Sequence, residues 1–193
     1  MTILVLGLLL FLGAHSVRIV ADAWRSHMMA RIGEKPWKGL YSLVSIAGFV
    51  LIVIGFGQAR LDSPALWHAP LALRHLTALL VLVALVLVFA AKGPNNAIRS
   101  RLHHPMVLGV KLWAFAHLLV NGRVVDVVLF GGFLLWAMAD FRSARQRDRA
   151  QQTAYPPGSL GASAIPVILG GAVWALFVFW AHRAWIGVSP LGF

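Results

Sequence analysis

The chain has 193 residues, of which 60% are hydrophobic and 12% charged, and it contains no cysteine. An ordinary soluble domain has roughly 45–50% apolar and about 25% charged residues, and here the apolar excess recurs along the whole sequence. This composition excludes a water-soluble enzyme, a disordered protein and a disulfide-stabilised scaffold. It predicts an all-α protein, a polytopic bundle of transmembrane helices.

Six stretches are apolar enough to cross a bilayer as helices, which takes about 20 mostly apolar residues. In chain order they are Thr2–Ala21, Gly39–Ala59, Pro70–Ala91, Pro105–Asn121, Val124–Phe141 and Ala164–Trp185. The fourth is short and ends at Asn121-Gly122, a turn-forming pair, so we expect the fourth and fifth to form a tight hairpin. Without internal repeats, residues 1–193 are expected to be a single membrane domain. The Pro- and Gly-rich segment Tyr155–Ser163 is expected to be a flexible linker.

The formal net charge is +11. The basic residues lie in short clusters between apolar spans, so we expect no nucleic-acid partner. The loops after the first, third and fifth spans contain eleven Lys and Arg residues, whereas the opposite side contains only Arg60, Arg123 and Arg183. Because Lys and Arg are retained on the cytoplasmic side of a membrane, those three loops are predicted to be cytoplasmic and both termini to lie outside.

Histidine is the main metal ligand that this sequence offers. The absence of cysteine excludes iron–sulfur clusters and thiolate-ligated haem, and Glu34 is the only glutamate, which excludes a carboxylate-rich di-iron site. Four of the eight histidines lie within or at the start of spans: His15, His75, His104 and His117. Imidazoles on several helices favour a metal or haem site in the bundle core over isolated interhelical hydrogen bonds.

Arg18 and Arg74 also lie within or near the ends of spans. Ionisable groups at membrane depth are costly, so each is a functional candidate. The alternative is that their side chains extend to the membrane surface.

The segment Leu102–Asp140, LHHPMVLGVKLWAFAHLLVNGRVVDVVLFGGFLLWAMAD, resembles the signature of the NnrU family. His15-Ser16-x-Arg18 and the closing Gly187-Val188-Ser189-Pro190-Leu191 resemble the ends of that family, so the resemblance covers nearly the whole chain. NnrU proteins are associated with bacterial denitrification, that is, nitrite and nitric oxide metabolism. Their plant and cyanobacterial relatives include the 15-cis-zeta-carotene isomerase, which uses haem b.

The resemblance implies a haem b-binding protein of the bacterial inner membrane, with periplasmic termini and a redox, nitric-oxide-handling or isomerase-like role. It implies His15 and His117 as axial ligands. The helical rise places these two within about 8 Å in depth, although depth alone also allows His75. We expect Arg18 and Arg74 to pair with the haem propionates and His104 to anchor the start of the fourth span.

The sequence differs from the isomerases at one position that matters for their mechanism. These relatives carry a cysteine where Ala114 stands, which excludes a ligand exchange from imidazole to thiolate here.

Two alternatives stay open. Isoprenylcysteine-carboxyl-methyltransferase-like enzymes also have an Arg-His-Pro element, but they need acidic residues after it, and no glutamate follows Pro105. The second alternative is a non-catalytic assembly factor for a respiratory complex. Lipid and haem are the expected partners, together with an electron-transfer or respiratory protein.

Overall fold

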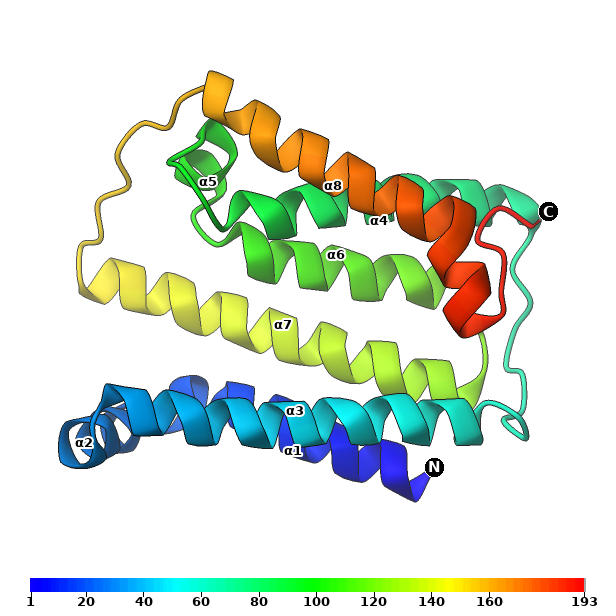
Figure 1. Ribbon diagram of the computed structural model, residues 1–193, viewed down its shortest axis with the longest axis horizontal. Helices are drawn as coiled ribbons and strands as arrows, with labels where there is room; N and C mark the ends of the chain where they lie inside the picture. Colours follow the sequence, from blue (N-terminus) through cyan, green and yellow to red (C-terminus); the bar gives the residue numbers. More distant parts are fainter. Residues whose placement is uncertain (193) are drawn as a thin grey trace.

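The computed structural model describes residues 1–192, in which the regular structure is helical and contains no β-strand. The helices are α1 (Thr2–Val20), α2 (Asp22–Ile32), α3 (Glu34–Ala59), α4 (Leu71–Ala90), α5 (Ala97–Leu102), α6 (Pro105–Val120), α7 (Val124–Ala150), the 3₁₀ turn η1 (Gly161–Ser163), α8 (Ala164–Leu176) and the π-helix η2 (Phe177–Ile186) (Figure 1). The predicted fold class is confirmed.

Five helical segments of the described chain are long and apolar enough to cross a membrane: α1, α3, α4, α7 and the continuous segment Gly161–Ile186. The sixth predicted span is α6, which is apolar but shorter. Two boundaries differ from the prediction, because α3 begins at Glu34 and α7 continues to Ala150. Hydropathy marks only the apolar part of a helix, whereas the Arg-rich end of α7 consists of good helix formers that extend it beyond the apolar region.

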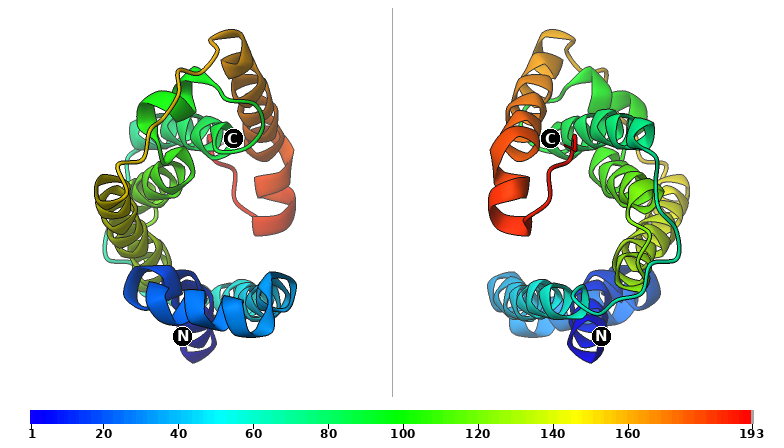
Figure 2. Two further views of the ribbon diagram at one scale, coloured as in Figure 1. Left: turned by 90° about the vertical axis from the view of Figure 1, so that its left-hand side faces the viewer. Right: turned by 90° about the vertical axis from the view of Figure 1, so that its right-hand side faces the viewer.

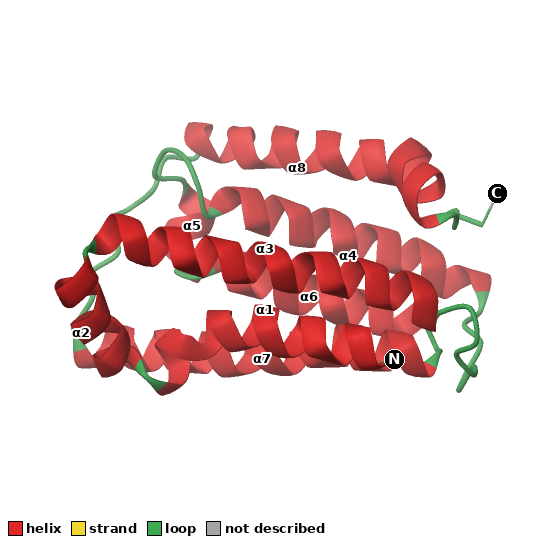
Figure 3. Ribbon diagram, turned by 60° about the horizontal axis from the view of Figure 1, so that its bottom comes forward, coloured by secondary structure: helices red, strands yellow, loops and turns green. Residues whose placement is uncertain are grey.

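The long helices lie side by side in an arc (Figure 2). The order along the arc is α3, α1, α7, α6, α4 and α8, and each helix packs mainly against the next. The predicted hairpin is present, since α6 and α7 pack together and only Asn121, Gly122 and Arg123 join them. Loops and short helices are confined to the two ends of the bundle (Figure 3).

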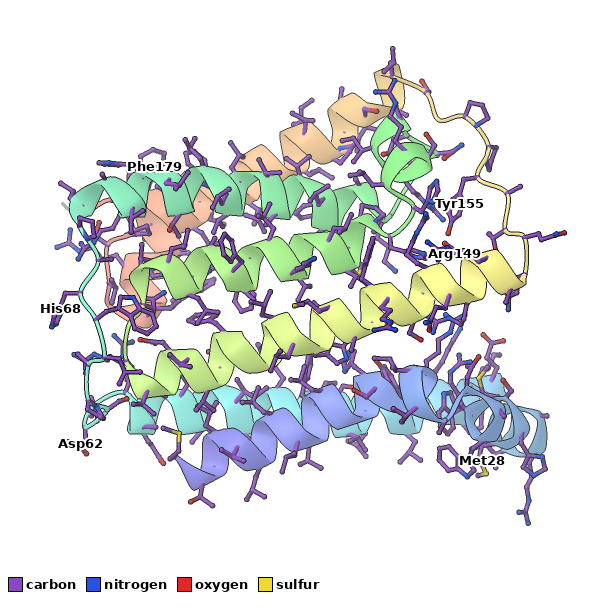
Figure 4. All side chains as sticks on the ribbon, turned by 180° about the vertical axis from the view of Figure 1, so that it is seen from behind. Met28, Asp62, His68, Arg149, Tyr155 and Phe179 are labelled. Carbon is purple, nitrogen blue, oxygen red and sulfur yellow. The ribbon has the colours of Figure 1, made fainter. Side chains whose placement is uncertain are left out.

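The two ends differ in charge. We call the end with α2, α5 and the last turns of α7 the basic end, and the opposite end, which carries both chain termini, the terminus end (Figure 1). Figure 4 places Met28, Arg149 and Tyr155 at the basic end, and Asp62 and His68 at the terminus end. A chain that crosses a membrane an even number of times has both termini on the same side, and the two termini here lie at the same end of the bundle.

The apolar core lies toward the terminus end, between α1, α3 and α7. Its buried members are Leu4, Leu8, Ile52, Val125, Leu129 and Phe130. Glycines let α1 and α3 approach closely: a Cβ atom on Gly7 would lie 2.6 Å from the backbone nitrogen of Ile52, and one on Gly48 2.7 Å from that of Phe11. Small residues permit such close helix packing in membranes, so this end of the bundle is tightly joined.

The segment that we expected to be a flexible linker is tied to α5. Asn95 Nδ2 donates to the carbonyl oxygen of Pro157 at 3.1 Å, and the backbone nitrogen of Ala97 donates to Ser163 Oγ at 3.0 Å. The prediction of flexibility relied on Pro and Gly content alone. These residues instead allow the backbone to lie closely along its neighbour.

Candidate functional site

A cavity of about 670 Å³ opens between α1, α2, α3, α6 and α7 in the basic-end half of the molecule. Its wall is rich in aromatic rings, which are Phe11, Trp37, Tyr41, Phe133 and Trp136. Its charged lining residues are Arg18, Arg25, Glu34, Lys38, Asp140, Arg147 and Asp148. Typical ligand pockets have volumes of about 300–1,000 Å³ and combine apolar walls with a few polar groups. This cavity has both properties.

His15 of α1 lines this cavity with its imidazole in a fixed orientation. Its Nδ1 lies 2.7 Å from the carbonyl oxygen of Phe11. A carbonyl oxygen can only accept a hydrogen bond, so Nδ1 carries the proton and Nε2 keeps its lone pair. The ring stacks on Phe11 at 4.3 Å and meets Tyr41 at 5.1 Å and Trp136 at 5.9 Å. Histidine binds a metal as a neutral imidazole, in which one ring nitrogen donates a hydrogen bond and the other, here Nε2, has a free lone pair.

His104 lines the same cavity from the start of α6. Its Nε2 lies 2.7 Å from Asp148 Oδ2 of α7, so Nε2 donates and Nδ1 is left with the lone pair. Carboxylates in this position orient ligand histidines and raise their basicity. The bond also ties the start of α6 to α7.

Asp148 is the centre of a polar cluster at the basic end. The hydroxyl of Tyr155 donates to its two carboxylate oxygens at 3.0 and 3.1 Å, and Arg145 Nη1 lies 3.8 Å from Oδ2. Tyr155 also stacks on His103, with ring centroids 3.9 Å apart, and Arg145 contacts that ring. Burial, and then the hydrogen bond to Asp148, raise the pKa of Tyr155, so its hydroxyl remains a donor at neutral pH.

Among the charged groups of the cavity, Asp140 is partly buried on α7 and lines the same cavity as Arg18 and Arg147. Arg18 lies 4.0 Å from Asp22, and Arg147 donates to Ser143 Oγ at 2.6 Å. Arg18 and Arg147 are therefore held near the cavity only by a weak or a neutral partner, whereas Lys38 is paired with Glu34 at 2.6 Å. The charges of Arg18 and Arg147 remain available to an anionic ligand group.

His117, the other predicted ligand, is not among the residues that line the cavity. Its Nδ1 lies 2.8 Å from the carbonyl oxygen of Trp113, which also leaves Nε2 free. Its ring stacks on Phe130 at 4.7 Å and meets Trp113 at 5.0 Å. A row of rings extends from His15 to His117 through Phe11, Phe133 and Trp113, with the two inner steps at 5.7 and 5.6 Å. His15 and His104 line one cavity, whereas His117 lies farther toward the terminus end.

The remaining candidates lie away from the cavity. Arg74 lines a second, smaller pocket of about 290 Å³ at the terminus end, next to His68 and Asn121. His75 is exposed on α4. Within residues 1–192, no group of three or more His, Cys, Asp or Glu side chains is arranged to hold a metal ion. Sequence reasoning missed Asp148 and Tyr155, because the histidines that they contact, His104 and His103, are distant in the chain.

Comparison with known proteins identifies the family. The model of the NnrU protein family matches residues 3–190. No curated protein and no solved structure matches the chain. Because the match covers nearly the whole chain, this protein belongs to the NnrU family.

Proposed function

We propose that this NnrU family member is a haem b-binding membrane protein and that the cavity at the basic end is its haem site. The observation that carries the proposal is His15, whose protonated Nδ1 is fixed on a carbonyl while Nε2 is free at an aromatic-lined cavity of about 670 Å³. Apolar walls suit a porphyrin ring, and imidazole is a common axial ligand of haem iron. When bound, haem b would supply one-electron redox chemistry.

Other residues of the cavity would provide the second axial ligand, bind the propionates and exclude water. His104, buttressed by Asp148, is the partner for His15 because both line one cavity. Arg18, Arg25 and Arg147 provide cations for two propionates, which are costly to bury without such partners. The aromatic rings exclude water from the ligand. The family resemblance assigns His117 opposite His15 instead, so the two pairings make different predictions.

The orientation follows from the charge distribution. The basic end is proposed to face the cytoplasm, with both termini in the periplasm of a bacterial inner membrane. The haem then lies in the cytoplasmic half, where an electron-transfer or respiratory partner would reach it. Its role is proposed in redox or nitric oxide and nitrite metabolism, or in a related isomerisation. Reporter fusions at Gln152 and at the C-terminus test the orientation, and a periplasmic Gln152 fusion contradicts it.

The visible spectrum of the detergent-purified protein tests the haem site. We expect the sharp bands of reduced, six-coordinate haem b in the wild-type protein. His15→Ala should abolish the six-coordinate spectrum, and His68→Ala, which alters an exposed histidine at the other end, should leave it unchanged. A wild-type protein that contains no haem after expression with excess haem contradicts the proposal.

His104→Ala and His117→Ala distinguish the second ligand. If His104 completes the cavity site, His104→Ala converts that haem to a five-coordinate, high-spin form. If the pairing implied by the resemblance holds, His104→Ala leaves the six-coordinate spectrum intact and His117→Ala removes it.

A further inference from the structure

The pocket of about 290 Å³ at the terminus end shares no lining residue with the cavity at the basic end. It opens where the loop between α3 and α4, the start of α4 and the α6–α7 hairpin meet. Its polar lining residues are His68, Arg74, Asn121, Arg123 and Asp126, and Figure 4 shows His68 on that loop. Its volume is at the lower limit of typical ligand pockets, so it suits a small polar ligand.

Backbone contacts between the loop and the hairpin give this pocket a fixed wall. The backbone nitrogens of Leu66 and Trp67 donate to the carbonyl oxygen of Gly122 at 2.6 and 3.3 Å. The backbone nitrogen of Val124 donates to the carbonyl oxygen of Pro64 at 3.1 Å. A Cβ atom on Gly122 would collide with the carbonyl oxygen of Trp67, so a glycine is required at this close approach. The wall is therefore built by the fold and not by surface side chains alone.

Arg123 provides a positive charge from this wall. Its Nη1 donates to the carbonyl oxygens of Arg60 at 2.9 Å and Ser63 at 3.3 Å. Both acceptors are neutral, so the guanidinium is held in place while its charge persists, and its other N–H groups remain donors. Asp126 Oδ2 accepts from the backbone nitrogen of Arg123 at 3.0 Å. The carboxylate thus serves to cap the start of α7.

Arg74 adds a second guanidinium from the first turn of α4. Within residues 1–192 it forms no ion pair with an acidic side chain. The N-cap of α4 is Pro70, and no side chain caps that helix by a hydrogen bond. Backbone N–H groups at such a helix start, and the positive end of the helix dipole, favour an anion. Two guanidinium groups and a single carboxylate, that of Asp126, make the pocket positively charged.

We propose that this pocket binds a small oxyanion, a carboxylate or phosphate group, through Arg74 and Arg123, with the side-chain amide of Asn121 as a further donor. Guanidinium groups bind such anions by paired, charge-assisted hydrogen bonds. The proposal is independent of the haem site, and it gives a role to Arg74, which the cavity at the basic end does not use. A free anion and a phospholipid headgroup both carry this chemistry, and the test below distinguishes them.

Calorimetric titration of inorganic phosphate into the detergent-purified full-length protein, at constant ionic strength, tests the site. We expect saturable binding to the wild type and about tenfold weaker binding to Arg74→Gln, because a hydrogen bond from a charged group is lost. The matched control Arg183→Gln removes the same charge from an exposed position of η2 outside the pocket. It should bind phosphate as the wild type does.

Short-chain phosphatidylglycerol, titrated in the same way, identifies the source of the anion. Tighter binding of this lipid than of phosphate, weakened by Arg74→Gln, supports a lipid headgroup as the ligand. Tighter binding of phosphate supports a free oxyanion.

Four outcomes overturn the proposal: neither probe binds the wild type saturably, Arg74→Gln binds as well as the wild type, Arg183→Gln weakens binding equally, or Arg74→Gln loses the haem spectrum. The last outcome would assign Arg74 to the haem site instead. Size-exclusion elution shows whether each variant is folded. If Arg74→Gln is not, Asn121→Ala, which removes one donor from the pocket, is used with the same direction of effect.

Discussion

The same three helices, α1, α3 and α7, make two different environments along their length. Toward the terminus end they enclose the apolar core of Leu4, Leu8, Ile52, Val125, Leu129 and Phe130. Toward the basic end they line a cavity with charged and aromatic side chains. Glycines at the close contacts bring α1 and α3 together in the first region, whereas the bulky side chains of His15, Trp37 and Trp136 line the cavity in the second. The two halves of these helices therefore differ in packing, and the open half contains the proposed binding site.

The largest expected effect comes from the packed half. Gly48→Leu places a side chain where even a Cβ atom would lie 2.7 Å from the backbone of Phe11. Backbone atoms cannot move aside cheaply, so we expect a loss of about 3 kcal/mol or more and no monodisperse protein. Gly13→Leu is the matched control on α1, because nothing lies within 4 Å of a Cβ atom there. Equal yields and elution profiles for the two variants would contradict this interpretation of the packed half.

The next effect concerns the polar cluster beside the cavity. Asp148→Ala removes the acceptor for both His104 and Tyr155, and each unsatisfied donor costs about 1–3 kcal/mol. We expect faster amide hydrogen exchange and earlier proteolysis in residues 151–163, together with a lower Tm in detergent. Asp62→Ala, at an exposed position of the terminus end, should change none of these. Unchanged protection of residues 151–163 in Asp148→Ala would show that Asn95 and Ser163 suffice to hold the segment.

A smaller effect is expected from a single hydroxyl in the same cluster. Tyr155→Phe keeps the stacking on His103 but removes the bond to Asp148, which stabilises by about 1 kcal/mol. Since the folded state raises the pKa of Tyr155, this stabilisation is complete below about pH 10, the usual tyrosine pKa. It is lost as the pH rises through the raised value. Thermal melts at increasing alkaline pH should therefore bring wild type and Tyr155→Phe together, and a constant difference would contradict the assignment.

The smallest effect separates the two arginines that the sequence grouped together. Arg18 lines the cavity and is half-exposed, whereas Arg74 lies at the other end. Solvent screens exposed charges, so Arg18→Ala should weaken haem retention in the cavity only about threefold, a small effect. Arg74→Ala should leave retention in the cavity unchanged. Haem transfer to apomyoglobin measures both rates, and a stronger effect of Arg74→Ala would place the propionates elsewhere.

Much of the architecture could be predicted because a bilayer constrains it so strongly. A helix satisfies its own backbone hydrogen bonds in lipid, so apolar length alone located six helices, and Asn121-Gly122 located the hairpin. The helix ends at Glu34 and Ala150 were missed since polar residues can continue a helix outside the apolar region. The segment Tyr155–Ser163 was misjudged because composition does not show that α5 lies beside it.

The sequence by itself determined the membrane helices, the asymmetry of charge and the choice of imidazole as the available metal ligand, because each depends on residue type and local order. The family of the chain is also determined there. Only the tertiary structure decided which histidines meet. His15 shares a cavity with His104, 89 residues further along the chain, whereas His117 does not line that cavity. Partners depend on how helices far apart in sequence pack around the arc, and depth along a single helix does not contain that information.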